Sequence, residues 1–172
     1  MINYDLRKIK ALVFDVDGVL SRSTLRIDGD GRLLRSANAK DVYALRLAAQ
    51  SGLCVAIITG AHEEDIRRRY QMIGVADVYL ASSVKTVSLQ DLLAKHALLP
   101  HEVLYMGDDI PDIPVLRQVG VPCCPRDAAA EVRSESLYVS HIDGGDGCVR
   151  DVVEQVLKAQ GKWMAGDAAF AW

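Results

Sequence analysis

The chain lacks the features that mark several large classes of protein. Its 172 residues contain no apolar run of about 18, the length that crosses a membrane, and its start, Met1–Lys8, lacks the apolar core of a signal peptide. The 20 basic residues are outnumbered by 23 acidic ones, so the composition gives no electrostatic reason to expect nucleic-acid binding. No internal repeat, low-complexity stretch or linker is visible. We therefore expect a soluble, cytoplasmic protein with no nucleic-acid or membrane partner.

Cysteine and histidine are few and show no metal-binding pattern. The 4 cysteines form no CxxC pair and no zinc-finger spacing. They are Cys54, Cys123, Cys124 and Cys148. Some lie inside apolar, strand-like runs, so we interpret them as small buried hydrophobic residues. The histidines are scattered, and we expect most of them at the surface; only His62 lies near a candidate site.

What the chain does contain is the composition of an ordinary globular domain, with 50% hydrophobic and 25% charged residues. We expect one domain over residues 1–172, with a hairpin at about 24–36 and a C-terminal tail at about 161–172. Apolar strand-like runs alternate with helical patterns, which is typical of a parallel sheet covered by helices. The expected strands are Ala11–Phe14, Leu53–Ile58, Asp77–Leu80, Val103–Met106 and Val121–Cys124. The expected helices begin after Asn38, at Glu63, near Lys85 and at about Cys148.

Two carboxylates follow the first strand directly. Asp15 and Asp17 lie two residues apart, and Gly18 permits a tight turn that folds both side chains toward one point. Paired carboxylates repel each other unless a cation lies between them or one is protonated. Because an α/β sheet opens its ligand crevice at the carboxyl ends of its strands, the pair indicates a metal or catalytic site. An Asp-Gly turn that merely ends a strand is the alternative.

Other polar side chains also follow expected strands. Thr59 ends one apolar run, Asp108 follows another, and Lys85 comes after a third and a short loop. Parallel strands end on one edge of the sheet, so these side chains can converge with Asp15 and Asp17. The alternative requires a separate structural role for each: a strand-end cap for Thr59, a solvated helix position for Lys85 and a helix start at Asp108. A shared site explains all of these positions together.

These residues carry a family resemblance over most of the chain. The segments that carry it are Asp15–Gly18, Thr59–Gly60, Lys85 and Gly107–Asp112. In this order they resemble the four motifs of haloacid dehalogenase superfamily phosphatases. The resemblance implies an α/β fold: a Rossmann-like, three-layer parallel sheet with helices on both faces and a small β-hairpin insertion after the first strand. No cap domain is expected, since the gaps after the first two motifs, about 17 and about 24 residues, are too short for one.

The residue types suit phosphoryl transfer. A carboxylate nucleophile divides phosphate ester hydrolysis into two easier steps through an aspartyl-phosphate. Asp15 is the expected nucleophile, and Asp17 the general acid and base that protonates the departing alkoxide and later deprotonates water. Asp15, Asp108 and the backbone carbonyl of Asp17 supply the oxygen ligands that Mg²⁺ prefers.

The remaining polar residues are expected to support this chemistry. Thr59 and the backbone N–H of Gly60 can donate hydrogen bonds to phosphate oxygens. Lys85 supplies a positive charge that also tempers the repulsion among the aspartates. Asp109 and Asp112 are expected to position Lys85 or metal-bound water molecules.

More closely, the chain resembles the 3-deoxy-D-manno-octulosonate 8-phosphate phosphatases, capless members of the superfamily with a hairpin after the first motif. The segments Gly144–Arg150 and Lys158–Lys162 are similar to the C-terminal region of these proteins. The resemblance implies a phosphorylated sugar acid as substrate and a place in lipopolysaccharide biosynthesis. It also implies that Arg69 contacts the substrate carboxylate from a neighbouring subunit; a solvated helix face is the alternative for this residue.

Two positions depart from the family pattern. Ala61 follows the Thr-Gly pair, where this family often carries Arg and related nine-carbon sugar acid phosphatases can carry Glu. The loop before Lys85 contains Leu80–Ser83 in place of the usual Gln-Gly. A nine-carbon sugar acid 9-phosphate is therefore an alternative substrate. A non-catalytic oligomerisation module related to nucleotidyltransferase-fused domains, and a phosphotransferase or mutase, are the alternatives from other classes.

Without a cap domain, an isolated crevice would stay open to water, whereas a small sugar phosphate needs enclosure to be distinguished. The hairpin around Asp28–Gly31 exposes strand edges that could pair with copies of themselves. The tail carries Trp163, Phe170 and Trp172. We expect a homotetramer in which the hairpin builds the interface and the tail closes over an adjoining site. Packing of the tail on its own domain is the alternative.

Overall fold

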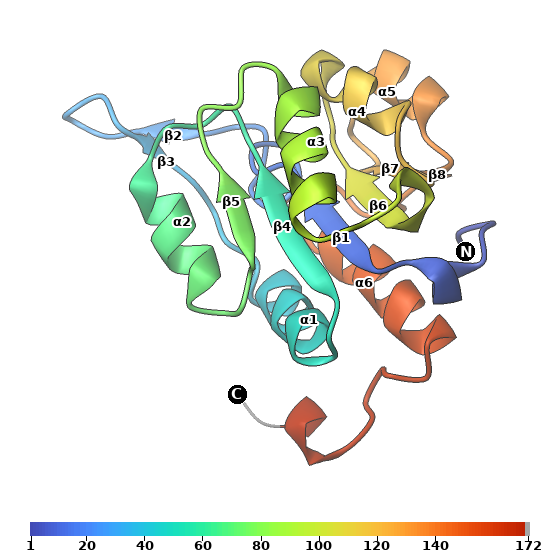
Figure 1. Ribbon diagram of the computed structural model, residues 1–172. Coiled ribbons are helices and arrows are strands. Elements are labelled where there is room, and N and C mark those ends of the chain that lie inside the picture. Colours follow the sequence, from blue (N-terminus) through green and yellow to red (C-terminus); the bar gives the residue numbers. More distant parts are fainter. Residues whose placement is uncertain (171–172) are drawn as a thin grey trace.

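A six-stranded parallel sheet forms the centre of the fold, in the order β5-β4-β1-β6-β7-β8 (Figure 1). The structure is a computed structural model, and it describes residues 1–170. The strands are β1 (Ala11–Phe14), β4 (Cys54–Ile58), β5 (Asp77–Tyr79), β6 (Val103–Met106), β7 (Val121–Cys124) and β8 (Tyr138–Val139). All neighbouring pairs in this sheet are parallel, so the expected fold class is confirmed.

Helices cover both faces of the sheet. They are α1 (Ala39–Gln50), α2 (Glu64–Gln71), α3 (Lys85–Lys95), α4 (Ile113–Leu116), α5 (Ala130–Glu135) and α6 (Cys148–Ala159). Short 3-10 helices are η1 (Leu6–Lys8), η2 (Pro100–Glu102), η3 (Ile110–Asp112) and η4 (Asp167–Phe170). Apolar side chains of α1, α2 and α6 join one hydrophobic core, and those of α3, α4 and α5 join the other. The result is the expected three-layer arrangement (Figure 1).

The alternation of side chains along β1 connects the two cores. Leu12 and Phe14 belong to the core under α1 and α6, whereas Ala11 and Val13 belong to the core under α3. All four residues of the strand are buried, as expected for a strand covered on both faces. Each such apolar side chain contributes roughly 1.5–3 kcal/mol to folding when fully buried. The central strand is therefore a rigid support for the residues that follow it.

The expected start of α1 is confirmed. The side chain of Asn38 accepts hydrogen bonds from the backbone N–H groups of Lys40 and Asp41, which satisfies two donors that a helix start leaves unpaired. Asp41 lies in the first turn, where a negative charge suits the helix dipole. The helix α2 also has acidic residues in its first turn, and it adds Arg68 and Arg69 in its last, where α1 has no basic residue.

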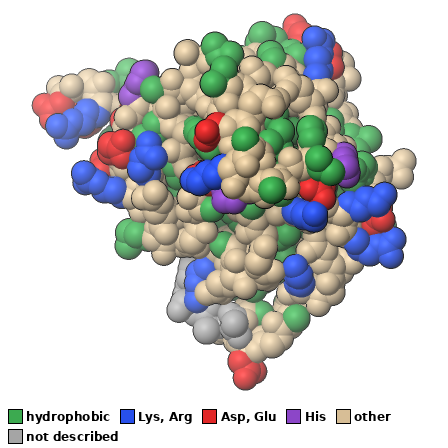
Figure 2. All heavy atoms as spheres, in the orientation of Figure 1, with side chains coloured by type: hydrophobic (Ala, Val, Ile, Leu, Met, Phe, Trp, Pro, Cys, Tyr) green, Lys and Arg blue, Asp and Glu red, His purple; other side chains and the backbone are tan. Residues whose placement is uncertain are grey.

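The expected hairpin is present but has short strands, β2 (Arg26–Ile27) and β3 (Leu33–Leu34), paired antiparallel. One carboxylate oxygen of Asp28 accepts the backbone N–H groups of Asp30 (2.9 Å) and Arg32 (2.8 Å), so the side chain closes the turn. The hairpin projects from the sheet beside α2 (Figure 1). In Figure 2 its tip carries acidic and basic side chains next to each other.

Several short elements were not expected from the sequence. These are β8, α4, α5 and the 3-10 helices. A two-residue edge strand and helices of four or six residues are too short to produce a measurable hydrophobic period. The tertiary structure decides them, since β8 exists only through its pairing with β7.

The cysteines and histidines occupy the expected environments. Cys123, Cys124 and Cys148 are buried and Cys54 is half-buried, and all four are free thiols. Three of the histidines are exposed, and His96 is half-buried beside Asp77. Within residues 1–170, no helix combines the length and the apolar character needed to cross a membrane.

The described part of the tail packs on its own domain. The ring of Trp163 lies edge-on to Tyr43 of α1, and the guanidinium of Arg150 lies 4.4 Å from the centroid of the Trp163 ring. The Tyr43 hydroxyl donates to the carbonyl of Ala169 (2.5 Å). These contacts correspond to the alternative that we considered for the tail. Trp172 lies outside the described residues.

Candidate active site

Asp15 lies at the carboxyl end of β1, a strand paired on both sides. Phe14, the last residue of β1, is in register with Ile57 of β4 and Met106 of β6. The backbone N–H of Asp15 donates to the Met106 carbonyl (3.0 Å), which continues the ladder by one residue. The Asp15 side chain is buried. Its carboxylate is therefore fixed where the central strands end.

Lys85, the first residue of α3, reaches two buried carboxylates. Its Nζ atom lies 3.1 Å from Oδ1 of Asp15 and 2.7 Å from Oδ1 of Asp112. Burial alone would lower the pKa of Lys85, but attraction to Asp15 and Asp112 outweighs it and raises the pKa. The lysine is therefore a permanent positive charge at this edge of the sheet.

Asp112 organises the loop after β6. Its Oδ1 accepts from Lys85 and from the hydroxyl of Tyr105 (2.5 Å). Its Oδ2 accepts the backbone N–H groups of Asp108 (3.0 Å) and Asp109 (3.2 Å). Four donors thus occupy this carboxylate, while the Asp109 side chain is exposed. Asp112 contacts Lys85 directly, and Asp109 takes part through its backbone.

Burial and mutual repulsion perturb the other two carboxyl groups. Burial raises the pKa of Asp15 to about 6, although Lys85 pulls it down. Burial, together with repulsion from Asp15 and Asp112, raises the pKa of Asp108 to about 8. Three carboxylates around one lysine therefore carry more negative charge than the protein itself neutralises. An arrangement of this kind favours an added cation.

The donor set fits a magnesium ion. Carboxylate oxygens of Asp15, Asp108 and Asp112 all lie within 4.8 Å of one another. Because four donors already occupy Asp112, Asp15 and Asp108 are the carboxylates best able to take a cation. Oxygen-only ligands suit Mg²⁺ rather than softer metals. The Asp17 carboxylate is not part of this group, and only its backbone carbonyl remains a candidate ligand.

Two glycines are required for this geometry. A Cβ atom on Gly18 would lie 1.9 Å from Oδ2 of Asp108, and Gly18 has a φ of +87°, which favours glycine. A Cβ atom on Gly107 would lie 2.3 Å from Cγ of Asp112. The carboxylates of Asp108 and Asp112 therefore approach the backbone at Gly18 and Gly107 so closely that no larger residue fits at either position.

Thr59 and Gly60 follow β4, the strand next to β1. Thr59 is buried, and its hydroxyl oxygen accepts the backbone N–H of Ala61 (3.2 Å), so the hydroxyl hydrogen can still be donated to a ligand. Gly60 is exposed and borders open space. Both residues lie at the same edge of the sheet as Asp15, as the parallel topology predicted.

Asp17 has a partner that the sequence did not reveal. Nε of Arg35 donates to Oδ1 of Asp17 (2.7 Å), and Nη2 donates to Oδ2 (2.9 Å). Nη1 of the same arginine lies 3.1 Å from Oε1 of Glu63. Arg35 follows β3, so the hairpin delivers it to a residue 18 positions earlier in the chain. No local sequence signal connects the two residues, because the pairing depends on how the hairpin folds back.

A cleft of about 870 Å³ lies between the hairpin and α2, next to the carboxylate cluster. Val16, Arg35, Glu63 and Arg69 are among its lining residues. Arg69 is exposed, and neither Asp15 nor Asp108 lines the cleft. Thus the structure brings Asp15, Lys85, Asp108 and Asp112 together and places Arg69 across the neighbouring cleft.

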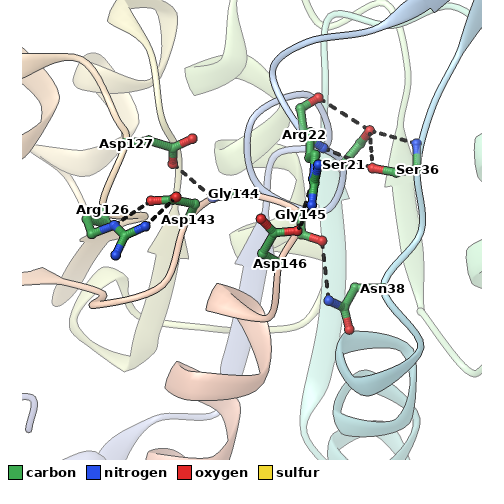
Figure 3. A network of polar contacts seen from close by, with 10 residues as sticks. All are labelled: Ser21, Arg22, Ser36, Asn38, Arg126, Asp127, Asp143, Gly144, Gly145 and Asp146. Carbon is green, nitrogen blue, oxygen red and sulfur yellow. Dashed lines mark hydrogen bonds and ion pairs between the residues drawn. The ribbon is translucent and has the colours of Figure 1, made fainter.

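The segment 143–147 supports the loop that follows β1 (Figure 3). The backbone N–H of Gly145 donates to the carbonyl of Val19 (2.8 Å), and the side chain of Arg22 donates twice to Asp146 (3.0 and 2.8 Å). A Cβ atom on Gly144 would lie 1.8 Å from the carbonyl oxygen of Gly18. In the sequence, this segment indicated only a similarity to the C-terminal region of a family. The Gly-Gly pair was the available sign of a close backbone approach.

The fold and the carboxylate–lysine cluster define a phosphatase of the haloacid dehalogenase superfamily. No family model matches the chain. A HAD superfamily (subfamily III A) hydrolase from Legionella pneumophila superimposes with a TM-score of 0.88 and 35% identity, over 92% of this chain and 87% of that one.

Similar proteins of known function indicate which family of this superfamily the chain belongs to. The chain is 40% identical over 154 residues to the 3-deoxy-D-manno-octulosonate 8-phosphate phosphatase KdsC of Salmonella typhi, covering 90% of this chain and 82% of that protein. The same phosphatase from Moraxella catarrhalis, solved in complex with magnesium, phosphate and KDO, has a TM-score of 0.90 and 31% identity, over 96% of this chain and 95% of that one. The chain belongs to the 3-deoxy-D-manno-octulosonate 8-phosphate phosphatase family.

Proposed function

We propose that the chain hydrolyses 3-deoxy-D-manno-octulosonate 8-phosphate to the free sugar acid and phosphate, with Mg²⁺ as its cofactor. One observation carries the proposal: the buried Asp15 carboxylate ends the central strand 3.1 Å from the Lys85 ammonium, within the group that includes Asp108. A nucleophile, a fixed positive charge and a metal ligand thus share one point, which is what phosphoryl transfer requires.

In the proposed reaction an Asp15 oxygen attacks phosphorus in line with the departing sugar oxygen. The Asp15 O–P bond forms as the bond between phosphorus and the sugar oxygen breaks, and Asp17 gives a proton to that oxygen. Water then attacks the phosphorus of the aspartyl-phosphate, and Asp17 takes the proton that the water loses. The new bond between phosphorus and the water oxygen forms as the bond between phosphorus and the Asp15 oxygen breaks, so phosphate is released and the Asp15 carboxylate is restored. Lys85 stabilises the charge on the phosphoryl oxygens throughout.

The remaining residues hold the phosphate. The Thr59 hydroxyl and the Gly60 N–H donate to its oxygens at the edge of the sheet. When bound between Asp15, Asp108 and the carbonyl of Asp17, Mg²⁺ would offset the negative charge of the cluster and of the phosphate. The carboxyl groups fit this role because their oxygens lie together. Burial, together with repulsion from Asp112, raises the pKa of both Asp15 and Asp108.

The choice of sugar rests on the relatives and on the cleft. The substrate is the one named for the Salmonella typhi and Moraxella catarrhalis proteins. The cleft beside the cluster presents Arg35 and Arg69, and a sugar acid carries a carboxylate that guanidinium groups bind well. We place the reaction in lipopolysaccharide biosynthesis, in the cytoplasm. Ala61 keeps a nine-carbon sugar acid 9-phosphate as the competing substrate.

The test is phosphate release from a panel of phosphorylated metabolites, with and without a chelator. We expect the eight-carbon sugar acid 8-phosphate to give the highest kcat/KM, and chelation to abolish turnover. A tenfold preference for the nine-carbon 9-phosphate would overturn the choice of sugar. Full turnover after exhaustive chelation would overturn the metal dependence, and no phosphate release from any ester would favour a non-catalytic module.

The working form is proposed to be a homotetramer assembled through the hairpin. Ile27, Leu33 and Leu34 are exposed to 71%, 40% and 51% on a two-stranded sheet whose outer edges are unpaired. Such edges and apolar side chains favour pairing with a second copy. Arg69 of a neighbour would then complete the site, together with the tail, which packs beside α1 on the neighbour's own domain. Light scattering should give four times the monomer mass, and deletion of residues 164–172 should impair turnover of the sugar phosphate more than that of a small ester. A fully active and selective monomer would contradict this arrangement.

A further inference from the structure

Arg35 lies between the general acid and base and the substrate cleft. The guanidinium donates one hydrogen bond to each carboxylate oxygen of Asp17, at 2.7 and 2.9 Å. Its third nitrogen contacts Glu63 at 3.1 Å. The Arg35 side chain is only 12% exposed, although the hairpin strands before it are exposed. A flexible surface arginine would not be enclosed and paired in this way.

This pairing holds Asp17 away from the reaction. The bidentate guanidinium occupies both oxygens of the Asp17 carboxylate, so neither oxygen is free for another partner. Oxygens of Asp17 do not belong to the group formed by Asp15, Asp108 and Asp112. To protonate a leaving oxygen at Asp15, the Asp17 side chain must give up at least one of its two bonds with Arg35.

We propose that Arg35 is a latch on Asp17 that the carboxylate of the substrate releases. The inference rests on the proposed function, because it requires a sugar acid as substrate. Arg35 lines the cleft of about 870 Å³, whereas Asp17 is not among the lining residues. A carboxylate in this cleft offers the guanidinium the same planar, two-oxygen partner that it has in Asp17. One carboxylate can thus replace another, while Glu63 keeps the arginine in place.

The exchange makes the latch a determinant of specificity. With a phosphate ester that lacks a carboxylate, the Arg35–Asp17 pair still has to break, but no new carboxylate binds the guanidinium. Hydrogen bonds to charged groups are strong enough that this loss slows turnover by about 10- to 100-fold. Ala61 carries no charge, whereas Arg35 is charged and lines the cleft, so Arg35 takes the role of distinguishing acids from neutral sugars.

The test compares two substrates that differ only in the carboxylate: 3-deoxy-D-manno-octulosonate 8-phosphate and its C1 methyl ester. In the Arg35→Gln variant, kcat/KM for the acid should fall about 10- to 100-fold, because the guanidinium that binds it is gone. The kcat for the methyl ester should rise several-fold, because Asp17 is released. Arg26→Gln is the matched control, since Arg26 is an exposed arginine of the same hairpin that does not line the cleft.

The rise with the methyl ester is the decisive reading. A merely structural role for Arg35 would lower turnover of both substrates, and simple substrate binding would lower only that of the acid; either result overturns the latch. Glu63→Gln leaves the Arg35–Asp17 pair but removes the charge that holds Arg35 in place. It should therefore change turnover of the acid and of the methyl ester in the same directions as Arg35→Gln, by smaller factors. Melting curves identify any variant that fails to fold, and Glu63→Gln then carries the test.

Failure of the latch can be separated from failure of the proposed function. If the wild-type protein hydrolyses the acid and Asp15→Asn does not, the proposed function stands whatever the Arg35 variants do. If the wild-type protein hydrolyses neither the acid nor the ester, both proposals are overturned. If the nine-carbon sugar acid is preferred, its own acid and methyl ester form the pair for comparison.

Discussion

Two regions of the site neutralise carboxylate charge to different extents. They are the carboxylate cluster around Lys85 and the Asp17–Arg35 pair, here called the rim pair. In the cluster, Asp15, Asp108 and Asp112 lie together with Lys85 as their partner, and burial, together with repulsion from Asp15 and Asp112, raises the pKa of Asp108 to about 8. In the rim pair, Arg35 grips Asp17 with two hydrogen bonds, and the pairing raises the pKa of the arginine. The excess negative charge of the cluster favours binding of a cation, whereas the paired charges of Asp17 and Arg35 hold the Asp17 side chain in one position. Under the proposed function, one part of the site would bind the metal and the adjacent part would transfer the proton.

The Asp15→Asn substitution in the cluster should have the largest effect on turnover. An amide cannot attack phosphorus, so phosphate release should fall by several orders of magnitude, while the circular dichroism spectrum stays the same. Stopped-flow or quench measurements with labelled substrate should also find no phosphorylated protein. Near-normal turnover of this variant would mean that another residue is the nucleophile.

Asp17→Asn should be the next largest effect. Loss of general acid and base catalysis costs roughly 10²–10⁴-fold in kcat. An aryl phosphate such as p-nitrophenyl phosphate has a leaving group that needs little protonation, so its first step should lose much less. Equal losses for the sugar phosphate and the aryl phosphate in single-turnover experiments would contradict the role of Asp17.

Lys85→Met tests the buried half of the comparison. Removal of one partner from a buried ion pair costs about 3–5 kcal/mol, because the remaining carboxylates are left uncompensated. Denaturant unfolding at pH 8 in a chelator should show a loss of this size. Lys95→Met is the matched control at the other end of α3, where the lysine side chain is 55% exposed and pairs with Asp77. An equally small loss of stability in both variants would show that the buried carboxylates do not depend on Lys85 for compensation of their charge.

The pH dependence of stability should also separate the cluster from the rim. The pKa of Asp108 is about 8 in the folded protein and near 3.8 otherwise, so between these values the folded state binds more protons than the unfolded state. Stability must therefore fall as pH rises through this window. In a chelator, the free energy of unfolding should decrease by at least about 1 kcal/mol between pH 6 and pH 8. Mg²⁺ should raise Tm more at pH 8 than at pH 6, and Asp108→Asn should flatten the dependence.

The smallest effect is expected when Arg35→Gln is measured by stability alone. The Asp17 side chain is 33% exposed, and partly exposed ion pairs contribute about 1 kcal/mol or less. Chemical denaturation should therefore show little change, even though turnover of the acid and of the methyl ester shifts in opposite directions. A loss above about 3 kcal/mol would place Arg35 with the structural ion pairs of the interior.

The sequence predicted the cluster better than the rim for a physical reason. Asp15, Thr59 and Asp108 each follow a strand of a parallel sheet, and parallel topology alone brings such positions to one edge. The cleft and the Asp17–Arg35 pair depend instead on the angle at which the hairpin folds back. The same limit applies to β8, which is too short to produce a pattern and forms through its contact with β7.

From the sequence alone we could predict the α/β class, the succession of the core strands along the chain, and the identity of the carboxylates and the lysine at their ends. Apolar periodicity and strand-end chemistry are local properties, so they can be interpreted from neighbouring residues. Tertiary packing selected Asp112 rather than Asp109 as the carboxylate that binds Lys85, brought Gly144 against Gly18, and paired Arg35 with Asp17. Each of these contacts joins residues that are distant along the chain. Their pairing follows from packing geometry, which sequence neighbours do not encode.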